Sequence, residues 1–112
     1  MSCIFCQIVS REIPSELIYE DDELIAFRDI EPQAPVHFLV LPKKHIALLT
    51  DMNDEEFPLI GKMAQVATEL AEKEGISDGF RIVVNCGEQG GQMVWHLHMH
   101  VLGGRQLKGR LG

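Results

Sequence analysis

The pattern of hydrophobic and polar residues divides the chain into short strands and one long helix. Apolar stretches over residues 17–19, 24–28, 36–41, 80–85 and 94–102 predict five strands. Residues 54–74 instead carry apolar side chains at spacings of three and four, which is typical of a helix with one buried face. Residues 3–10 predict a short helical turn. Adjacent strands with one long helix indicate an antiparallel α+β fold.

The ends of the long helix carry capping residues. Asn53 followed three residues later by Glu56 is a capping-box pattern, and Gly75 is a typical C-terminal stop. Pro58 disfavours regular hydrogen bonding in the first turns, so we expect the regular helix to begin later than the cap indicates. Residues 87–91 predict a glycine-bearing turn of hairpin length between the last two strands.

Three of the five histidines lie on alternate positions of the last predicted strand, within His-Leu-His-Met-His at residues 96–100. Side chains alternate across a strand, so the three imidazoles would share one face. The opposite face would supply the core contact with Trp95, Leu97, Met99 and Val101. Each buried ring nitrogen then needs a hydrogen-bond partner or a ligand.

Three interpretations of these histidines compete: a solvated strand face, a zinc site and phosphoryl chemistry. On a strand His96 and His100 would lie about 13 Å apart. Zinc–nitrogen bonds are only about 2 Å long, so one ion would not hold all three rings. A neutral imidazole is a good nucleophile toward phosphorus, and Gly90 and Gly91 just upstream allow backbone amides to approach a phosphate. We favour phosphoryl chemistry.

Composition and charge narrow the class of protein. The 112 residues are 46% hydrophobic and 24% charged, as in one soluble globular domain. A net charge of −7 argues against a broad nucleic-acid surface. We see no apolar run of membrane-spanning length and no signal-peptide pattern, so we expect a cytoplasmic protein with no membrane or nucleic-acid partner. Three cysteines do not make a disulfide framework and suggest thiols or metal ligands.

The histidine run resembles the His-φ-His-φ-His-φ-φ signature (φ apolar) of the histidine-triad (HIT) family. Further stretches resemble its Hint branch: Glu12-Ile13-Pro14, Ala26-Phe27-Arg28-Asp29-Ile30, Pro32-Gln33-Ala34-Pro35, His37-Phe38-Leu39-Val40, Pro42-Lys43-Lys44-His45-Ile46, Val84-Asn85, Gly90-Gly91-Gln92 and Gly103-Gly104-Arg105. The resemblance implies a single HIT domain over residues 1–112, with an antiparallel sheet of about five strands, one long helix and a short N-terminal helix.

The resemblance also implies a reaction. HIT proteins of the Hint branch are purine nucleoside phosphoramidases or related nucleotidyl hydrolases, acting on conjugates of nucleotides such as AMP or GMP through a nucleotidyl-histidine. By position His98 would be the nucleophile and His100 would hydrogen-bond the phosphate oxygens, with His96 completing the catalytic triad. Asn85 and Gln92, with the adjacent Gly91, would help to place the phosphate and the leaving group.

The remaining binding residues follow from the same resemblance. Asp29 would bind the ribose hydroxyls, since a carboxylate accepts two hydrogen bonds; the plain alternative is a solvated loop acid. Met93 replaces a serine of animal relatives that is thought to contact the leaving group. His37 would either support His98 by hydrogen bonding or be an ordinary core histidine. The base pocket, or alternatively ordinary core, would comprise Phe5, Ile13, Phe27 and Ile30.

The pair Cys3 and Cys6 would share one face of the N-terminal helical turn. Zinc ligation, redox chemistry and two buried thiols are all compatible with this spacing. Many bacterial HIT proteins complete such a pair with two histidines, which here are His45 and His96, so the resemblance implies a structural zinc site. Cys86 is expected to be a small buried residue.

The resemblance implies a homodimer with a continuous sheet. Two alternatives stay open for the function. One is a dinucleotide polyphosphate hydrolase. The other is a protein from a different class, either a nucleotide-binding regulator with incidental turnover or a zinc-stabilised interaction module.

Overall fold

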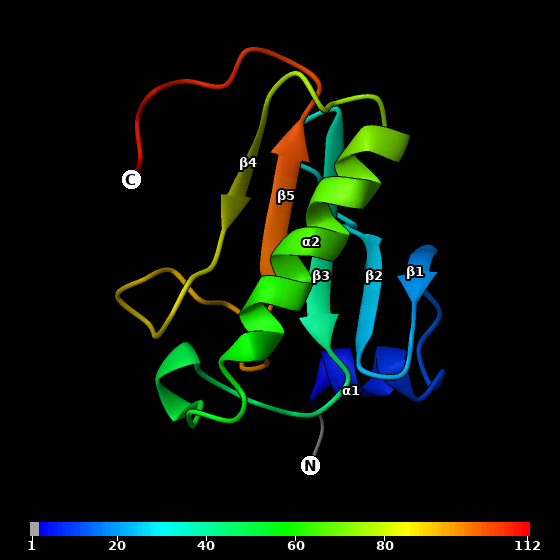
Figure 1. Ribbon diagram of the computed structural model, residues 1–112, viewed down its shortest axis with the longest axis vertical. Coiled ribbons are helices and arrows are strands. Elements are labelled where there is room, and N and C mark those ends of the chain that lie inside the picture. Colours follow the sequence, from blue (N-terminus) through cyan, green and yellow to red (C-terminus); the bar gives the residue numbers. More distant parts are fainter. Residues whose placement is uncertain (1–2) are drawn as a thin grey trace.

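The computed structural model describes residues 3–112, and it has the predicted α+β architecture (Figure 1). Five strands form one antiparallel sheet in the order β1-β2-β3-β5-β4. Two α-helices and a 3₁₀ turn complete the fold. In chain order the elements are α1 Ile4–Val9, β1 Leu17–Glu20, β2 Leu24–Arg28, β3 Val36–Pro42, the 3₁₀ turn η1 Leu49–Asp51, α2 Pro58–Lys73, β4 Phe80–Val83 and β5 Met99–Gly103.

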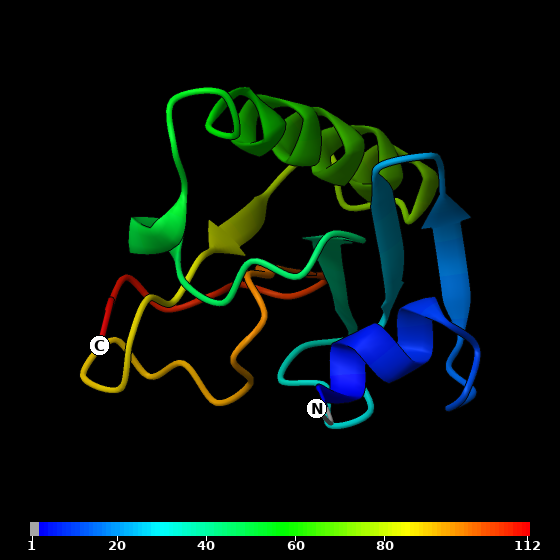
Figure 2. The same ribbon diagram turned by 90° about the horizontal axis from the view of Figure 1, so that it is seen from below.

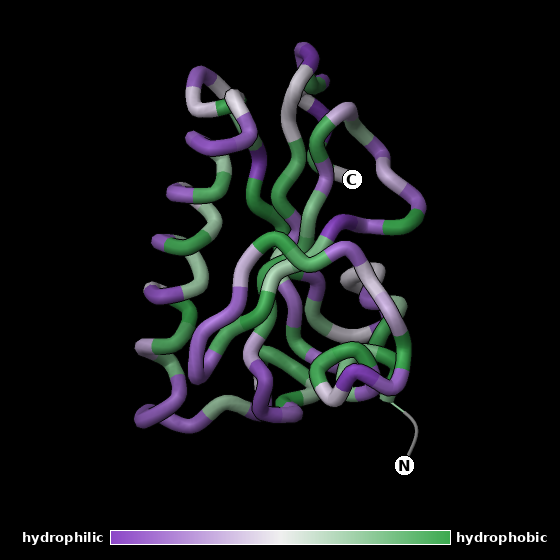
Figure 3. Tube along the Cα trace, turned by 90° about the vertical axis from the view of Figure 1, so that its right-hand side faces the viewer, coloured by the Kyte–Doolittle hydropathy of each residue, from purple (hydrophilic) through white to green (hydrophobic). Residues whose placement is uncertain are grey.

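The sheet separates two hydrophobic clusters. The long helix α2 covers one face, and α1 lies against the other face beside β2 (Figure 2). Successive strand residues point to opposite faces, so Phe38 and Val40 of β3 pack toward α2, whereas Leu39 and Leu41 join the cluster around α1. The side of α2 that faces the sheet is hydrophobic and its outer side is polar (Figure 3).

Helix α2 begins later than its capping box indicates, as Pro58 predicted. Asn53 and Glu56 make both reciprocal hydrogen bonds of a capping box, 2.9 and 3.0 Å long. The regular helix nevertheless begins at Pro58, because proline is favourable in the first turn, where no backbone donor is needed. Among residues 3–112, no helix is both long enough and apolar enough to cross a membrane.

The last strand is shorter than predicted, and this is the main correction to the fold. The prediction began it at residue 94, but β5 starts at Met99. The preceding residues bond to the segment after β3 instead of to the sheet: Leu97 donates its amide to the Ile46 carbonyl at 2.6 Å. His96 and His98 therefore precede the strand, and only His100 is part of it.

The connection from β4 to β5 is correspondingly longer than a hairpin turn. Strand β4 ends at Val83 rather than residue 85, and residues 84–98 form one extended loop, which we call the β4–β5 loop. Trp95 is 47% exposed and does not join the core, in contrast to the prediction, while Leu97, Met99 and Val101 do. Cys86 was expected to be buried, but it lies in this loop and is only half-buried.

Two glycines of α2 and its C-terminus give a matched test of this fold. Gly75 has φ +77°, in the left-handed region, and a Cβ there would meet no atom within 4 Å. We expect Gly75→Ala to lower the free energy of unfolding by about 1 kcal/mol through backbone strain alone. Gly61, also with free space around it, lies inside the helix, so Gly61→Ala should raise stability by about 0.5–1 kcal/mol. Urea denaturation of both variants measures this, and equal effects of the same sign would contradict it.

Candidate functional site

A cavity of about 550 Å³ opens on the sheet face opposite α2. It lies between α1, the loop after β2 and the β4–β5 loop. The structure brings most of the predicted substrate residues into its wall: Phe5, Ile13, Phe27, Asp29, Ile30, His37, Asn85, Gly91, Met93, His98 and His100. Gln92 and His96 do not line it.

Several lining residues were not predicted from the sequence. Ile4 and Ile8 of α1 face the cavity, and their spacing of four, with Phe5 between them, is the signal that identifies this helix face. Ser15 and Val94 also line the cavity, but they carry no local pattern that would mark them. Their places depend on how the loops after α1 and β4 cross the sheet.

His98 is held in one protonation form by a backbone carbonyl. Its Nδ1 lies 2.7 Å from the carbonyl oxygen of His96, and a carbonyl only accepts, so Nδ1 carries the proton. The lone pair of the neutral ring is therefore on Nε2. The Phe5 ring packs edge-on against the imidazole, with centroids 5.0 Å apart, and fixes its plane. The side chain is buried yet belongs to the cavity wall.

His100 has the opposite protonation pattern, which His37 imposes. The backbone amide of Gln33 donates to Nδ1 of His37 at 3.0 Å, so the proton of His37 lies on Nε2. That Nε2–H donates to Nδ1 of His100, also at 3.0 Å. The proton of a neutral His100 is then on Nε2. The rings of His98 and His100 are adjacent, with centroids 4.9 Å apart. Nε2 of His98 therefore carries a lone pair, whereas Nε2 of His100 carries a proton.

Burial keeps these imidazoles neutral. Desolvation holds the pKa of His98 and of His37 below the ordinary value, although the Asp29 carboxylate acts in the opposite direction. The pKa of His100 is lowered to about 4, first by burial and then by the neighbouring His98 and His37. At neutral pH the pair therefore presents a nucleophilic nitrogen and a hydrogen-bond donor, with no charge on either ring.

The three polar residues predicted to bind substrate, Asp29, Asn85 and Gln92, have different positions relative to the cavity. Asp29 accepts from the Glu31 amide through Oδ1 at 2.8 Å, and its Oδ2 lies 3.5 Å from Nε2 of His37, at the cavity. Asn85 donates to the Gly90 carbonyl and keeps a second amide hydrogen. Gln92 is buried outside the cavity, where its side chain bonds to the backbone of Ala47, Gly87 and Val94. Gln92 therefore stabilises the β4–β5 loop.

Arg28, beside the cavity, is fully engaged within the protein. Its two terminal nitrogens form a fork with the carboxylate of Glu74 at 2.6 and 3.0 Å, and Nε donates to Glu16 at 2.8 Å. It is the one lysine or arginine among the described residues that line the cavity. The cavity thus offers a phosphate no free cationic side chain.

The four predicted metal ligands converge at the N-terminus of α1. Nδ1 of His96 lies 3.4 Å from the Cys3 sulfur, 3.5 Å from the Cys6 sulfur and 3.2 Å from Nδ1 of His45. The Cys6 sulfur lies 3.3 Å from the same nitrogen of His45. A tetrahedral zinc shell has nitrogen–nitrogen edges of about 3.3 Å and nitrogen–sulfur edges of about 3.6 Å, given its bond lengths. The donor atoms are therefore spaced for one tetrahedral ion.

The hydrogen bonds also leave the correct nitrogen free for a metal. Nε2 of His96 donates to the Pro42 carbonyl at 2.7 Å, so the lone pair is on Nδ1, among the sulfurs. Without a cation, burial and the Cys3 thiol raise the pKa of Cys6 to about 11. A second group, formed by Asp29, His37 and His100, is also compact. It fits a metal poorly, because Gln33 already donates to Nδ1 of His37 and places the proton on Nε2.

Comparison with known proteins agrees with this fold. A family model described as the HIT domain matches residues 10–107. Protein HitA of Neisseria gonorrhoeae is 46% identical over 102 residues, which cover 91% of this chain and 95% of that protein. The crystal structure of a HIT family hydrolase from Legionella pneumophila superimposes with a TM-score of 0.96 at 47% identity, covering 99% of this chain and 100% of that one. The chain belongs to the HIT family.

Two further structures bear on the site. A zinc-bound histidine triad family protein from Mycobacterium smegmatis has a TM-score of 0.82 at 37% identity, covering 94% of this chain and 76% of that one. A histidine triad nucleotide-binding protein from Candida albicans has a TM-score of 0.81 at 28% identity, covering 99% and 87%.

The buried neutral histidines make stability depend on pH. Their pKa values in the folded protein lie below the value of about 6.5 in the unfolded chain, so the unfolded chain binds more protons as the pH falls. The contribution of these neutral histidines to the free energy of unfolding is complete above pH 6.5 and is lost as the pH falls from about 6.5 to 4. We expect the thermal midpoint to fall by several degrees from pH 7 to pH 5, and His100→Asn to flatten this dependence. A midpoint that is constant over this range would contradict the burial argument.

Proposed function

We propose that the protein hydrolyses nucleoside 5′-phosphoramidates or related purine nucleotide conjugates, as in the Hint branch of the family. The observation that carries the proposal is the opposite protonation of the two imidazoles in one cavity. A nucleophile needs a lone pair directed at phosphorus, and the developing charge on the phosphate oxygens needs a donor beside it. His98 supplies the first and His100 the second. The nucleotide-binding relative of Candida albicans supports a nucleotide as the ligand.

The reaction would proceed in two displacements. Nε2 of His98 forms a bond to the α-phosphorus, and the bond from phosphorus to the leaving nitrogen breaks. The leaving nitrogen keeps the electron pair and takes up a proton from solvent, while the N–H of His100 donates a hydrogen bond to the phosphate oxygens. Water then attacks phosphorus and loses a proton to solvent, the bond to His98 breaks with its electron pair returning to Nε2, and the nucleoside monophosphate is released. Asp29 would bind the ribose, and the apolar side chains of Phe5, Phe27 and Ile30 would hold the base.

The charge of the cavity favours a substrate with few negative charges. Arg28 is paired, the imidazoles are neutral, and Asp29 and Glu31 are acidic, within a chain of net charge −7. A phosphoramidate monoester carries one negative charge at phosphorus, whereas a dinucleotide polyphosphate carries several. Neutral donors suffice for the former, while the latter ordinarily needs lysine, arginine or a metal ion. Dinucleotide polyphosphates are therefore the second candidate substrate class, after phosphoramidates.

The nucleotidyl-histidine gives a direct test. The protein is incubated with an adenosine 5′-phosphoramidate, quenched in base because phosphohistidine is acid-labile, and digested for mass spectrometry. We expect an adenylyl mass on the peptide bearing His98, and a loss of turnover of about 10³-fold or more in His98→Ala. Faster turnover of a dinucleotide polyphosphate would support the second candidate.

The matched variant for this test is Arg28→Gln, because Arg28 lines the cavity but its guanidinium bonds to Glu74 and Glu16. It should retain the adduct. Absence of the adduct together with unchanged turnover in His98→Ala would contradict the covalent mechanism. Tight nucleotide binding without turnover would indicate a regulator.

We also propose that one zinc ion is held by Cys3, Cys6, His45 and His96. The spacing of the donor atoms and the zinc-bound relative of Mycobacterium smegmatis support this. Four protein ligands leave no open position, so zinc would be structural and would join α1 to the two segments that carry the histidines. It has no part in the displacement itself.

Metal analysis checks the zinc site independently of activity. We expect one zinc per chain in the wild type, less than about a tenth of that in Cys3→Ser, and a lower thermal midpoint after chelation. His98→Ala is the matched control, since it changes a neighbouring imidazole outside the ligand set and should keep its zinc. Equal zinc in wild type and Cys3→Ser would refute the site.

We propose a homodimer that forms through strand β4. This strand is at one edge of the sheet, and its Ile82 is 38% exposed, so a second copy would pair with the open edge. The molar mass in solution, measured by light scattering, tests this, and a monomer at micromolar concentration would contradict it.

A further inference from the structure

A second, smaller cavity adjoins the nucleotide cavity away from the reacting imidazoles. Its volume is about 260 Å³, and it shares Ile8, Ile13, Pro14 and Ser15 with the larger cavity. Two residues, Arg11 and Leu17, line the smaller cavity alone. No histidine and no acidic residue of the described range 3–112 lines it. The two spaces therefore share a wall, which is formed by α1 and the loop that follows it.

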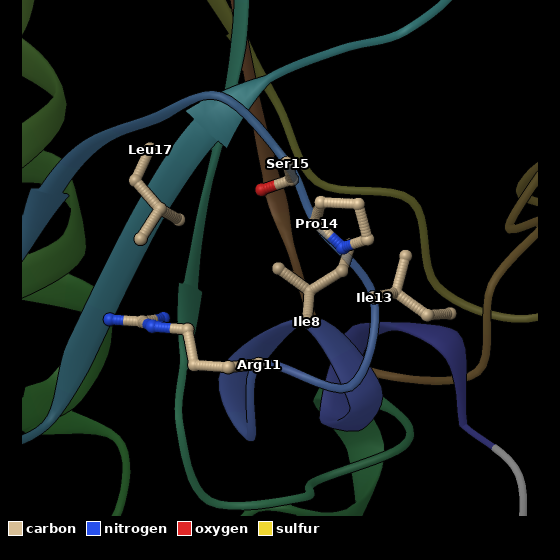
Figure 4. Close-up of a pocket in the computed structure, with 6 residues that line it drawn as sticks. All are labelled: Ile8, Arg11, Ile13, Pro14, Ser15 and Leu17. Carbon is tan, nitrogen blue, oxygen red and sulfur yellow. The ribbon is translucent and has the colours of Figure 1, made fainter.

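Ser15 is the unusual residue of this shared wall. Among the residues that the structure describes, its Oγ is the one buried side-chain oxygen or nitrogen without a hydrogen-bond partner in the protein. Figure 4 shows the hydroxyl turned away from Ile13 and toward the side of the cavity where Leu17 lies. A buried hydroxyl without a partner is unfavourable, and native proteins rarely keep one unless a ligand or water completes it.

Apart from Ser15, the smaller cavity has one polar lining residue, Arg11, and its other lining side chains are apolar. Ile8, Ile13, Pro14 and Leu17 are apolar. The guanidinium of Arg11 forms an ion pair with Glu20. An apolar pocket holds a purine ring by burial but discriminates poorly between bases, whereas a hydroxyl that needs a partner rejects a base that lacks one.

We propose that the smaller cavity is a subsite for the exocyclic group at position 6 of the purine, and that Ser15 favours purines that carry such a group by hydrogen-bonding it. This inference rests on the proposed function, because it takes the larger cavity to hold a purine nucleotide. Adenine has one exocyclic group, the 6-amino group, and guanine has an oxygen at the same position. A hydroxyl accepts from the former and donates to the latter, so both purines fit.

The hydroxyl is tested by equilibrium binding of two nucleotides, AMP and purine riboside 5′-monophosphate, which lacks the 6-substituent. The wild type should bind AMP roughly twofold to tenfold more tightly, the range expected for one hydrogen bond. Ser15→Ala should bring the ratio close to one by weakening AMP alone. Ser15→Thr keeps the hydroxyl and should keep the preference. An unchanged ratio in Ser15→Ala would show that the hydroxyl is satisfied by water only, and would overturn the proposal.

The space is tested with an AMP that carries an N6-benzyl group. It should bind to the wild type about as tightly as AMP, because the smaller cavity receives the substituent. Leu17 is 36% exposed on the edge strand β1 and does not line the larger cavity, so Leu17→Trp should fold normally and fill the smaller one. This variant should weaken N6-benzyl-AMP by at least roughly tenfold more than it weakens AMP, because the benzyl group needs more of the space than the amino group does. Equal binding of N6-benzyl-AMP to both proteins would count against the subsite.

These measurements need no turnover. Absence of phosphoramidate hydrolysis would therefore contradict the proposed function and leave the subsite standing, whereas a Ser15-independent ratio would overturn the subsite and leave the hydrolysis standing.

Discussion

The structure depends on one fully buried residue, His96, whose polar groups point in three directions. Its Nε2 donates to the Pro42 carbonyl and ties the β4–β5 loop to the end of β3. That bond leaves Nδ1 as the lone pair that faces Cys3, Cys6 and His45. Its own carbonyl accepts from Nδ1 of His98 and so leaves the lone pair of His98 on Nε2. The fold, the candidate metal site and the candidate nucleophile are thus linked through a single side chain and its peptide.

Neutrality is the second feature of the site. Burial lowers the pKa of His37, His98 and His100, so the rings act as lone pair and donor rather than as cations. Arg28, the cationic side chain beside them, is held by Glu74 and Glu16. Such a cavity stabilises charge that develops during a reaction better than charge already on the ligand. This balance suits transfer at a singly charged phosphorus centre.

Much of the fold could be predicted from local pattern, and the exceptions have a common cause. Periodicity identified the strands and α2, and Gly75 identified the helix end, because these signals depend on neighbours within a few residues. The prediction of a strand from residue 94 was wrong, since Leu97 bonds to Ile46, a partner about fifty residues away. The same distant bonding places Trp95 at the surface and Gln92 outside the cavity. No sequence pattern marked Ser15, because its distinguishing feature is a buried hydroxyl without a hydrogen-bond partner, and only the tertiary structure shows that.

The sequence by itself determined the α+β class, the HIT resemblance and the residues that could do chemistry, since side-chain types and short spacings are written locally. It also indicated that the three histidines must divide their roles, although it treated them as one strand face. Only the tertiary structure decided how they divide. The protonation of each ring depends on a backbone group. For His96 and for His100 that group comes from another part of the fold, namely Pro42 and, through His37, Gln33. For His98 it is the carbonyl of His96, which lies two residues away and is brought into place by the loop conformation. Hydrogen bonds between distant segments, which no local pattern records, distinguish a metal ligand from a nucleophile and a nucleophile from a donor.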